Sequence, residues 1–188
     1  MWWPENTLRI RGLGAILGAL ALALTTGGCF QPLYGSRSPL GGPGVASALN
    51  AVQVEPIEAP NGTPVARLGV QVRNALIFEL TGGGAAVNPT HKLKIDLSPV
   101  RTEIIEDITT GRPEVETFGI DATYSLTEIA TNRVVVTGRT FSRVSYDIPG
   151  EQQRFAKARG LRDAEDRASK EIASSIQQRL ASHFLAGT

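Results

Sequence analysis

The sequence predicts an α+β fold, a two-layer sandwich in which one four-stranded sheet carries two helices packed on one face. Apolar residues recur every three or four positions in residues 64–80 and again in residues 151–183, the spacing of helices with one buried stripe. Between these segments, apolar and polar residues alternate in three runs, as they do in strands with one buried face. One more short alternating run precedes the first helix, so the expected order is β-α-β-β-β-α.

The first strand is expected at residues 51–57, where valines alternate with polar residues. The first helix is expected at residues 64–80, because Thr63 can cap its N-terminus and Pro64 fits the first helical position. The three glycines at 82–84 end this helix.

Three further strands are expected at residues 91–97, 115–129 and 133–146. Pro99 is expected to bend the chain after the first of them, and residues 110–113 (TGRP) have the composition of a turn. Short connections between alternating runs favour an antiparallel meander.

The second helix is expected at residues 151–183, after Pro149 and Gly150. Its predicted buried stripe consists of Phe155, Ala158, Leu161, Ala164, Ala168, Ile172, Ile176, Leu180 and Phe184. Asp163, Glu165 and Asp166 alternate with arginines along the same helix. We therefore interpret these carboxylates as a solvated helix face, stabilised by pairs at i and i+4, and not as a reactive cluster.

Residues 1–28 have the layout of a secretory signal peptide, with two early arginines, an apolar run and small residues. The apolar run, residues 13–24, is twelve residues long. A helix of that length covers roughly 18 Å, whereas the hydrocarbon core of a bilayer is about 30 Å thick. This segment is therefore too short for a permanent membrane span.

Cys29 is the only cysteine and follows Gly27 and Gly28 directly, so an intramolecular disulfide is excluded. Its position resembles the bacterial lipobox, in which the cysteine becomes the new N-terminus and carries acyl chains, although Thr26 stands where that motif usually has an aliphatic residue. Two or more acyl chains anchor a protein stably. By the same resemblance, the absence of Asp at position 30 favours the outer membrane over the inner one.

The expected organisation is thus a signal peptide (1–28), a lipidated N-terminus with a flexible tether rich in Pro, Gly and Ser (29–49), and one α+β domain (50–188). Without the signal peptide the chain has 17 basic and 17 acidic residues. This balance lacks the basicity of a nucleic-acid binder.

No enzyme motif is present in the sequence: there is no G-x-S-x-G elbow and no phosphate-binding loop after the glycines at 82–84. The two histidines, His91 and His183, lie far apart in the sequence, so we expect no metal site. We also expect no cofactor and no catalysis.

A basic strand face is the candidate interaction site. In the last strand Arg133, Arg139 and Arg143 share a face by period-two geometry, and Lys92 and Lys94 lie on the polar face of an earlier strand. If these faces coincide, the sheet has a basic open side. Arginine and lysine recognise phosphates well, but the same residues also fit an ordinary solvated face that prevents aggregation.

Three stretches resemble the LptE family of lipopolysaccharide-assembly lipoproteins, especially its alphaproteobacterial members. They are Cys29–Gly35 (CFQPLYG), Tyr124–Thr127 continuing to Val136–Arg139, and Ser145–Tyr146 followed by the charged helix with Arg162–Ala168. Together the three stretches span most of residues 29–184, and the order of the predicted elements is similar to that of the family.

The resemblance implies a non-enzymatic lipoprotein on the periplasmic side of the outer membrane. Such a protein plugs an LptD-like β-barrel translocon and helps to deliver lipopolysaccharide to the cell surface. The expected partners are this barrel, lipopolysaccharide, and the membrane through acyl chains on Cys29. The alternative is an outer-membrane lipoprotein that binds lipid or assists transport without a barrel partner.

Overall fold

The computed structural model describes residues 44–107, 112–147 and 154–186. Its elements are α2 (Val45–Asn50), β1 (Val52–Val54), α3 (Pro64–Thr81), β2 (His91–Asp107), β3 (Arg112–Glu128), β4 (Arg133–Asp147) and α4 (Arg154–Ala186). The predicted signal peptide, Cys29, the tether up to residue 43, the turn residues Thr110 and Gly111, and residues 149–153 lie outside the described residues.

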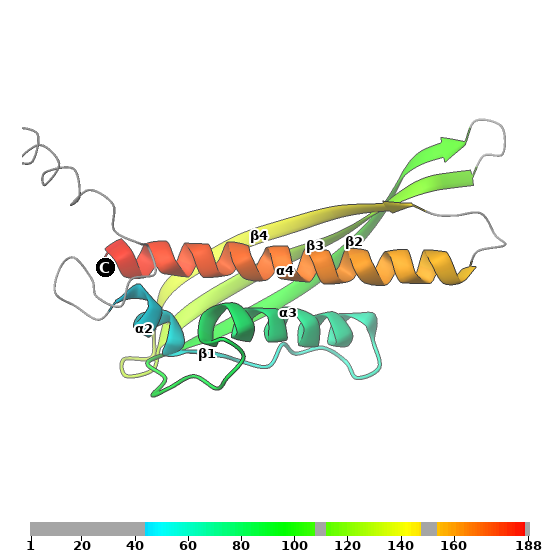
Figure 1. The fold of residues 1–188 in the computed structure, drawn as a ribbon. Helices are drawn as coiled ribbons and strands as arrows, with labels where there is room; N and C mark the ends of the chain where they lie inside the picture. Colours follow the sequence, from blue (N-terminus) through cyan, green and yellow to red (C-terminus); the bar gives the residue numbers. More distant parts are fainter. Residues whose placement is uncertain (1–43, 108–111, 148–153, 187–188) are drawn as a thin grey trace, which may run out of the picture. The chain divides into compact units, whose positions relative to one another are not determined.

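The predicted α+β sandwich is confirmed. The four strands form one sheet in the order β1-β2-β3-β4, and α3 and α4 lie side by side on one face of it (Figure 1). Strands β2, β3 and β4 form the expected antiparallel meander, whereas β1 pairs with β2 in parallel over three residues.

Strand lengths differ from the prediction. β1 ends at Val54, before the expected end at residue 57. β2 runs without interruption through Pro99, which pairs with Ile120, and residues 112–113 belong to β3 and not to a turn. Proline lacks a backbone N–H and is tolerated in a strand at the edge of a sheet. β1 pairs with β2 only up to Leu93, so at Pro99 no β1 residue needs a hydrogen bond from β2.

Helix α2 corrects the predicted tether. Residues 45–49 were expected to be extended, but they are helical, and Val45 and Leu49 are buried in the core. The two apolar residues are four positions apart and therefore share one face of the helix. The folded domain accordingly starts about five residues earlier than the composition of this segment suggests.

The predicted ends of α3 are confirmed by its caps. The backbone N–H of Ala66 donates to Oγ1 of Thr63 at 3.2 Å. At the other end Gly82 has φ of 71°, in the left-handed region that glycine adopts at little cost, and its N–H donates to the carbonyl of Phe78 at 2.9 Å.

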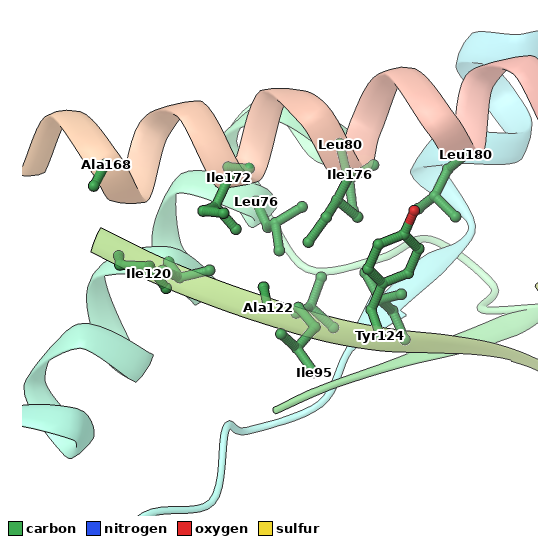
Figure 2. Packing of buried hydrophobic residues seen from close by; sticks show 14 of the residues in the cluster. Leu76, Leu80, Ile95, Ile120, Ala122, Tyr124, Ala168, Ile172, Ile176 and Leu180 are labelled. Carbon is green, nitrogen blue, oxygen red and sulfur yellow. The ribbon is translucent and has the colours of Figure 1, made fainter. Parts of the chain in front are cut away.

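One hydrophobic core lies between the sheet and the two helices (Figure 2). Leu76 and Leu80 of α3 meet Ile172, Ile176 and Leu180 of α4 above the sheet. Small residues bring the layers close: Ala164, Ala168, Ala173 and Ala181 of α4 are all fully buried.

The predicted buried stripe is wrong at its start, because Phe155 is 88% exposed and Ala158 is exposed as well. Helix α4 has 33 residues and α3 has 18, so α4 is the longer by about 22 Å. Arg67, near the start of α3, contacts Glu165 of α4, so the first turns of α4 extend beyond α3. In the part of the chain that the structure describes, no helix is long and apolar enough to span a membrane.

Candidate functional site

One face of the sheet carries no helix in the part of the chain that the structure describes, and we call it the open face. Pairing across the strands assigns to it Lys92, Lys94, Asp96, Ser98, Val100 and Thr102 of β2, Thr117, Gly119, Asp121, Thr123, Ser125 and Thr127 of β3, and Val134, Thr137, Arg139, Phe141, Arg143 and Ser145 of β4. Apart from three apolar side chains and one glycine, these residues are charged or carry hydroxyl groups. The open face is therefore polar over most of its area.

Four of the five predicted basic residues lie on the open face. Thr137 and Lys94 both pair with Ser125, and Arg139 and Asp96 both pair with Thr123. Neighbouring strands lie about 4.8 Å apart, so β2 and β4 residues in one row are about 10 Å apart. The lysines and arginines thus share a surface on opposite sides of the central strand.

Arg133 does not belong to this basic surface, which corrects the prediction from period-two alternation. Leu126 pairs with Val136, but the next β3 residue, Thr127, pairs with Val134, so Val135 is an extra residue in β4. Such an irregularity reverses the face of every residue before it. Arg133 therefore pairs with Glu128, in register with the helix-covered face.

Arg143 is held in place by several contacts. Its Nη2 donates to both carboxylate oxygens of Asp121 at 2.7 and 3.0 Å, and its Nη1 donates to the carbonyl of Ser142 at 2.9 Å. The side chain crosses β3 over Gly119, where an added Cβ would lie 2.6 Å from Cδ of Arg143. These contacts use much of the hydrogen-bonding capacity of the guanidinium group.

Arg139 differs from Arg143 because no carboxylate pairs with it among the described residues. It borders a hollow of about 540 Å³ on the open face, lined by Asp96, Ser98, Asp121, Thr123, Arg139, Thr140 and Phe141. This hollow combines an arginine that has no carboxylate partner within the described ranges, two carboxylates, hydroxyl groups and an exposed aromatic ring.

A buried ion pair joins the two helices on the other face of the sheet. Nη1 and Nη2 of Arg67 donate to the carboxylate of Glu165 at 2.5 and 2.9 Å, and Glu165 is fully buried. The carboxylate raises the pKa of Arg67. Glu165 therefore does not belong to a solvated face, whereas its neighbours Asp163 and Asp166 form the expected exposed pairs with Arg167 and Lys170.

The two histidines, distant in the sequence, both contact Phe184. The ring centroid of Phe184 lies 5.3 Å from that of His91 and 5.5 Å from that of His183. Burial lowers the pKa of His91. This cluster forms because β2 and α4 pack together, so the sequence alone does not reveal it. Within the described ranges, no group of three or more His, Cys, Asp or Glu residues could hold a metal ion.

Residues 49–180 match the LptE family, described as lipopolysaccharide-assembly. This match covers well over half of the chain. The chain belongs to the LptE family. Membership of this family gives the chain a role in lipopolysaccharide assembly, and the LptE family is non-enzymatic.

Solved structures share the fold. A putative lipoprotein from Caulobacter crescentus is 23% identical, with a TM-score of 0.59 over 77% of this chain and 97% of that one. The rare lipoprotein B from Shewanella oneidensis is 16% identical, with a TM-score of 0.50 over 72% and 96% of the two chains. A search of curated protein sequences finds no match.

Proposed function

We propose that this LptE-family protein is an outer-membrane lipoprotein, anchored by acyl chains on Cys29, that plugs a β-barrel translocon and assists lipopolysaccharide delivery to the cell surface. The observation that carries the proposal is the family match over residues 49–180. The lipobox-like sequence before Cys29 supports the anchor.

The polar open face fits a position inside a large barrel. The interiors of outer-membrane barrels are polar, and the open face exposes charged and hydroxyl side chains along three strands. Cys29 precedes Gly44, the first described residue, by 15 positions. An extended chain of that length spans at most about 50 Å, which leaves the domain within reach of a barrel in the same membrane.

Extraction from native membranes tests the barrel partner. The wild-type protein, extracted in mild detergent, should copurify with a β-barrel protein in a one-to-one complex. Recovery of the protein without a barrel, together with bound lipid, would instead favour the accessory role without a barrel partner.

The anchor is tested separately with Cys29→Ala. This variant should fold like the wild type, because Cys29 precedes the first described residue of the domain by 15 positions. It should also be mislocalised, because it lacks the cysteine that would carry the acyl chains. Mass analysis of the membrane-extracted wild type should find an acylated N-terminal cysteine at position 29. An unmodified Cys29 would contradict this part of the proposal.

A further inference from the structure

The hollow on the open face is centred on Thr123, which pairs with Asp96 on one side and with Arg139 on the other. In the next row Asp121 pairs with Phe141. The volume of about 540 Å³ lies within the range of about 300–1,000 Å³ that is typical of small-molecule sites. A ligand of one or two sugar rings would fit this volume.

Phe141 provides an aromatic surface at the rim of this hollow. Its side chain is 68% exposed, although it lies on a strand. The guanidinium carbon of Arg143 lies 5.5 Å from the ring centroid, and Arg143 is itself held by Asp121. These partners orient the ring before any ligand arrives, which lowers the entropy cost of binding.

The polar groups around the ring are carboxylates, hydroxyls and one guanidinium group. Asp96 and Asp121 offer carboxylate oxygens that accept hydrogen bonds from hydroxyl groups, and Ser98 and Thr123 can donate or accept. Arg139, which has no carboxylate partner among the described residues, offers a planar fork for a carboxylate or a phosphate.

This combination excludes simpler ligands. Because Asp121 is paired with Arg143, an inorganic phosphate ion would meet only Arg139 and the carboxylate of Asp96 and would leave Phe141 without a contact. An acyl chain would desolvate the charged rim of the hollow at a cost. An anionic sugar matches each kind of group, because its C–H face packs on the aromatic ring, its hydroxyls donate to the carboxylates, and its anionic group pairs with Arg139.

We propose that the hollow binds an anionic sugar, a pyranose that carries a carboxylate or a phosphate group. Phe141 stacks on the ring, Arg139 binds the anionic group, Asp96 and Asp121 accept hydrogen bonds from hydroxyls, and Arg143 positions Phe141. The inference rests on the proposed function, because it names the saccharide part of lipopolysaccharide as the part that the open face holds.

Titration calorimetry with the full mature chain in detergent tests this site. The probe is completely deacylated lipopolysaccharide, which keeps its sugars, carboxylates and phosphates. Phe141→Ala should raise Kd about five- to tenfold through the loss of one aromatic contact, and Arg139→Gln should raise it by about tenfold or more. Phe78→Ala is the matched control, since Phe78 is also 68% exposed but belongs to α3, and should leave Kd unchanged.

Three results would overturn the inference: Phe141→Ala and Arg139→Gln variants that bind the probe like the wild type, inorganic phosphate that displaces the probe completely at equal concentration, or neutral maltotriose that binds equally well. Urea unfolding midpoints equal to that of the wild type verify that both variants are folded. If the variants keep the probe but lose the barrel, the hollow is a protein contact and the inference fails.

The test also separates this inference from the proposed function. A protein that copurifies with a barrel but does not bind the deacylated probe retains the proposed function without the sugar site. A protein that binds the probe through Phe141 but has no barrel partner retains the sugar site without the plug.

Discussion

At the scale of single residues, Glu165 shows how burial changes the role of a charged side chain. It lies between two acidic neighbours that face solvent, yet it is fully buried and bonded to Arg67 of α3. The side chain of Arg67 is 46% exposed. The two partners of this pair therefore differ in how they respond when the other is removed.

Arg67→Ala should destabilise the protein by about 3–5 kcal/mol, because it leaves a buried carboxylate without its cation. Glu165→Gln should cost less, since the freed Arg67 can reach water. Asp166→Asn is the control: it removes an exposed pair with Lys170 and should cost at most about 1 kcal/mol. Urea denaturation of the three variants gives the order, and equal costs for Arg67→Ala and Asp166→Asn would contradict it.

His91 makes stability depend on pH. Burial lowers its pKa in the folded state, opposed by Glu128 and reinforced by His183, so the unfolded chain binds more protons than the folded one. The contribution of His91 to the free energy of unfolding should therefore be fully present above the unfolded pKa of about 6.5. It should fall as the pH drops below that value toward the folded pKa of His91.

Urea unfolding at a series of pH values from 8 to 5 measures this dependence. His91→Gln should flatten the part of the curve below about pH 6.5, because it removes the titrating group but keeps a polar side chain. A variant with the same slope as the wild type would assign the pH dependence to other groups.

At the scale of elements, α4 holds the two layers together. It packs on β3, β4, α3 and α2, and its alanines let it approach them closely. Oγ of Ser142 on β4 donates to Oε2 of Glu171 on α4 at 2.6 Å. Nζ of Lys157 on α4 lies 3.7 Å from Oε2 of the buried Glu116 on β3. Polar contacts thus fix the position of α4 along the sheet, while apolar burial supplies its stability.

Ile176→Ala should destabilise the protein by about 2–5 kcal/mol, because Ile176 is fully buried between α3 and the sheet. Phe155→Ala removes a larger apolar side chain from the same helix but should change stability by less than about 0.5 kcal/mol, since Phe155 is exposed. Thermal or urea unfolding compares the two. A small effect at Ile176 would show that α4 is peripheral to the fold.

At the scale of the whole molecule, α3 and α4 cover one face of the sheet, and no described helix covers the open face. The charges of the open face are Lys92, Lys94, Arg139 and Arg143 against Asp96 and Asp121, so the face is basic although residues 29–188 carry 17 basic and 17 acidic residues. Since Arg143 and Asp121 pair with each other, the lysines and Arg139 supply the excess.

Charge reversal at Lys94 and Arg139 together should weaken binding to intact lipopolysaccharide, and the wild-type affinity should fall with added salt. Exposed charges are screened beyond a Debye length of about 8 Å at physiological ionic strength. Stability should change by less than about 0.5 kcal/mol per substitution, because both residues are exposed. Binding that is insensitive to salt and to both substitutions would assign these residues to an ordinary solvated face.

Arg143→Glu is the matched contrast. It places a carboxylate beside Asp121 and so replaces an ion pair with a repulsion. This variant should lower stability as well as binding, and urea unfolding separates the two effects. Arg143 is therefore a poor choice for a test of binding alone.

Apart from α2, the order of the elements could be predicted from the sequence, as could most of the two helical stripes and the polarity of the sheet faces, because periods of 3.6 and 2 residues are local properties of the chain. The cap at Thr63 and Gly82 is local in the same sense. The family resemblance rested on motifs in the same local stretches.

Only the tertiary structure decided the partners of the charged residues that pair between elements, whereas the i,i+4 pairs Asp163–Arg167 and Asp166–Lys170 follow from the sequence. Arg67 and Glu165 are 98 positions apart, and Asp121 and Arg143 are 22 apart, so neither pair has a local signature. The extra residue in β4 moved Arg133 to the other side of the sheet, because the face of a strand residue depends on its pairing register and not on the chain's own alternation. These ion pairs and this strand register form between different elements of the chain, so only the packed structure reveals them.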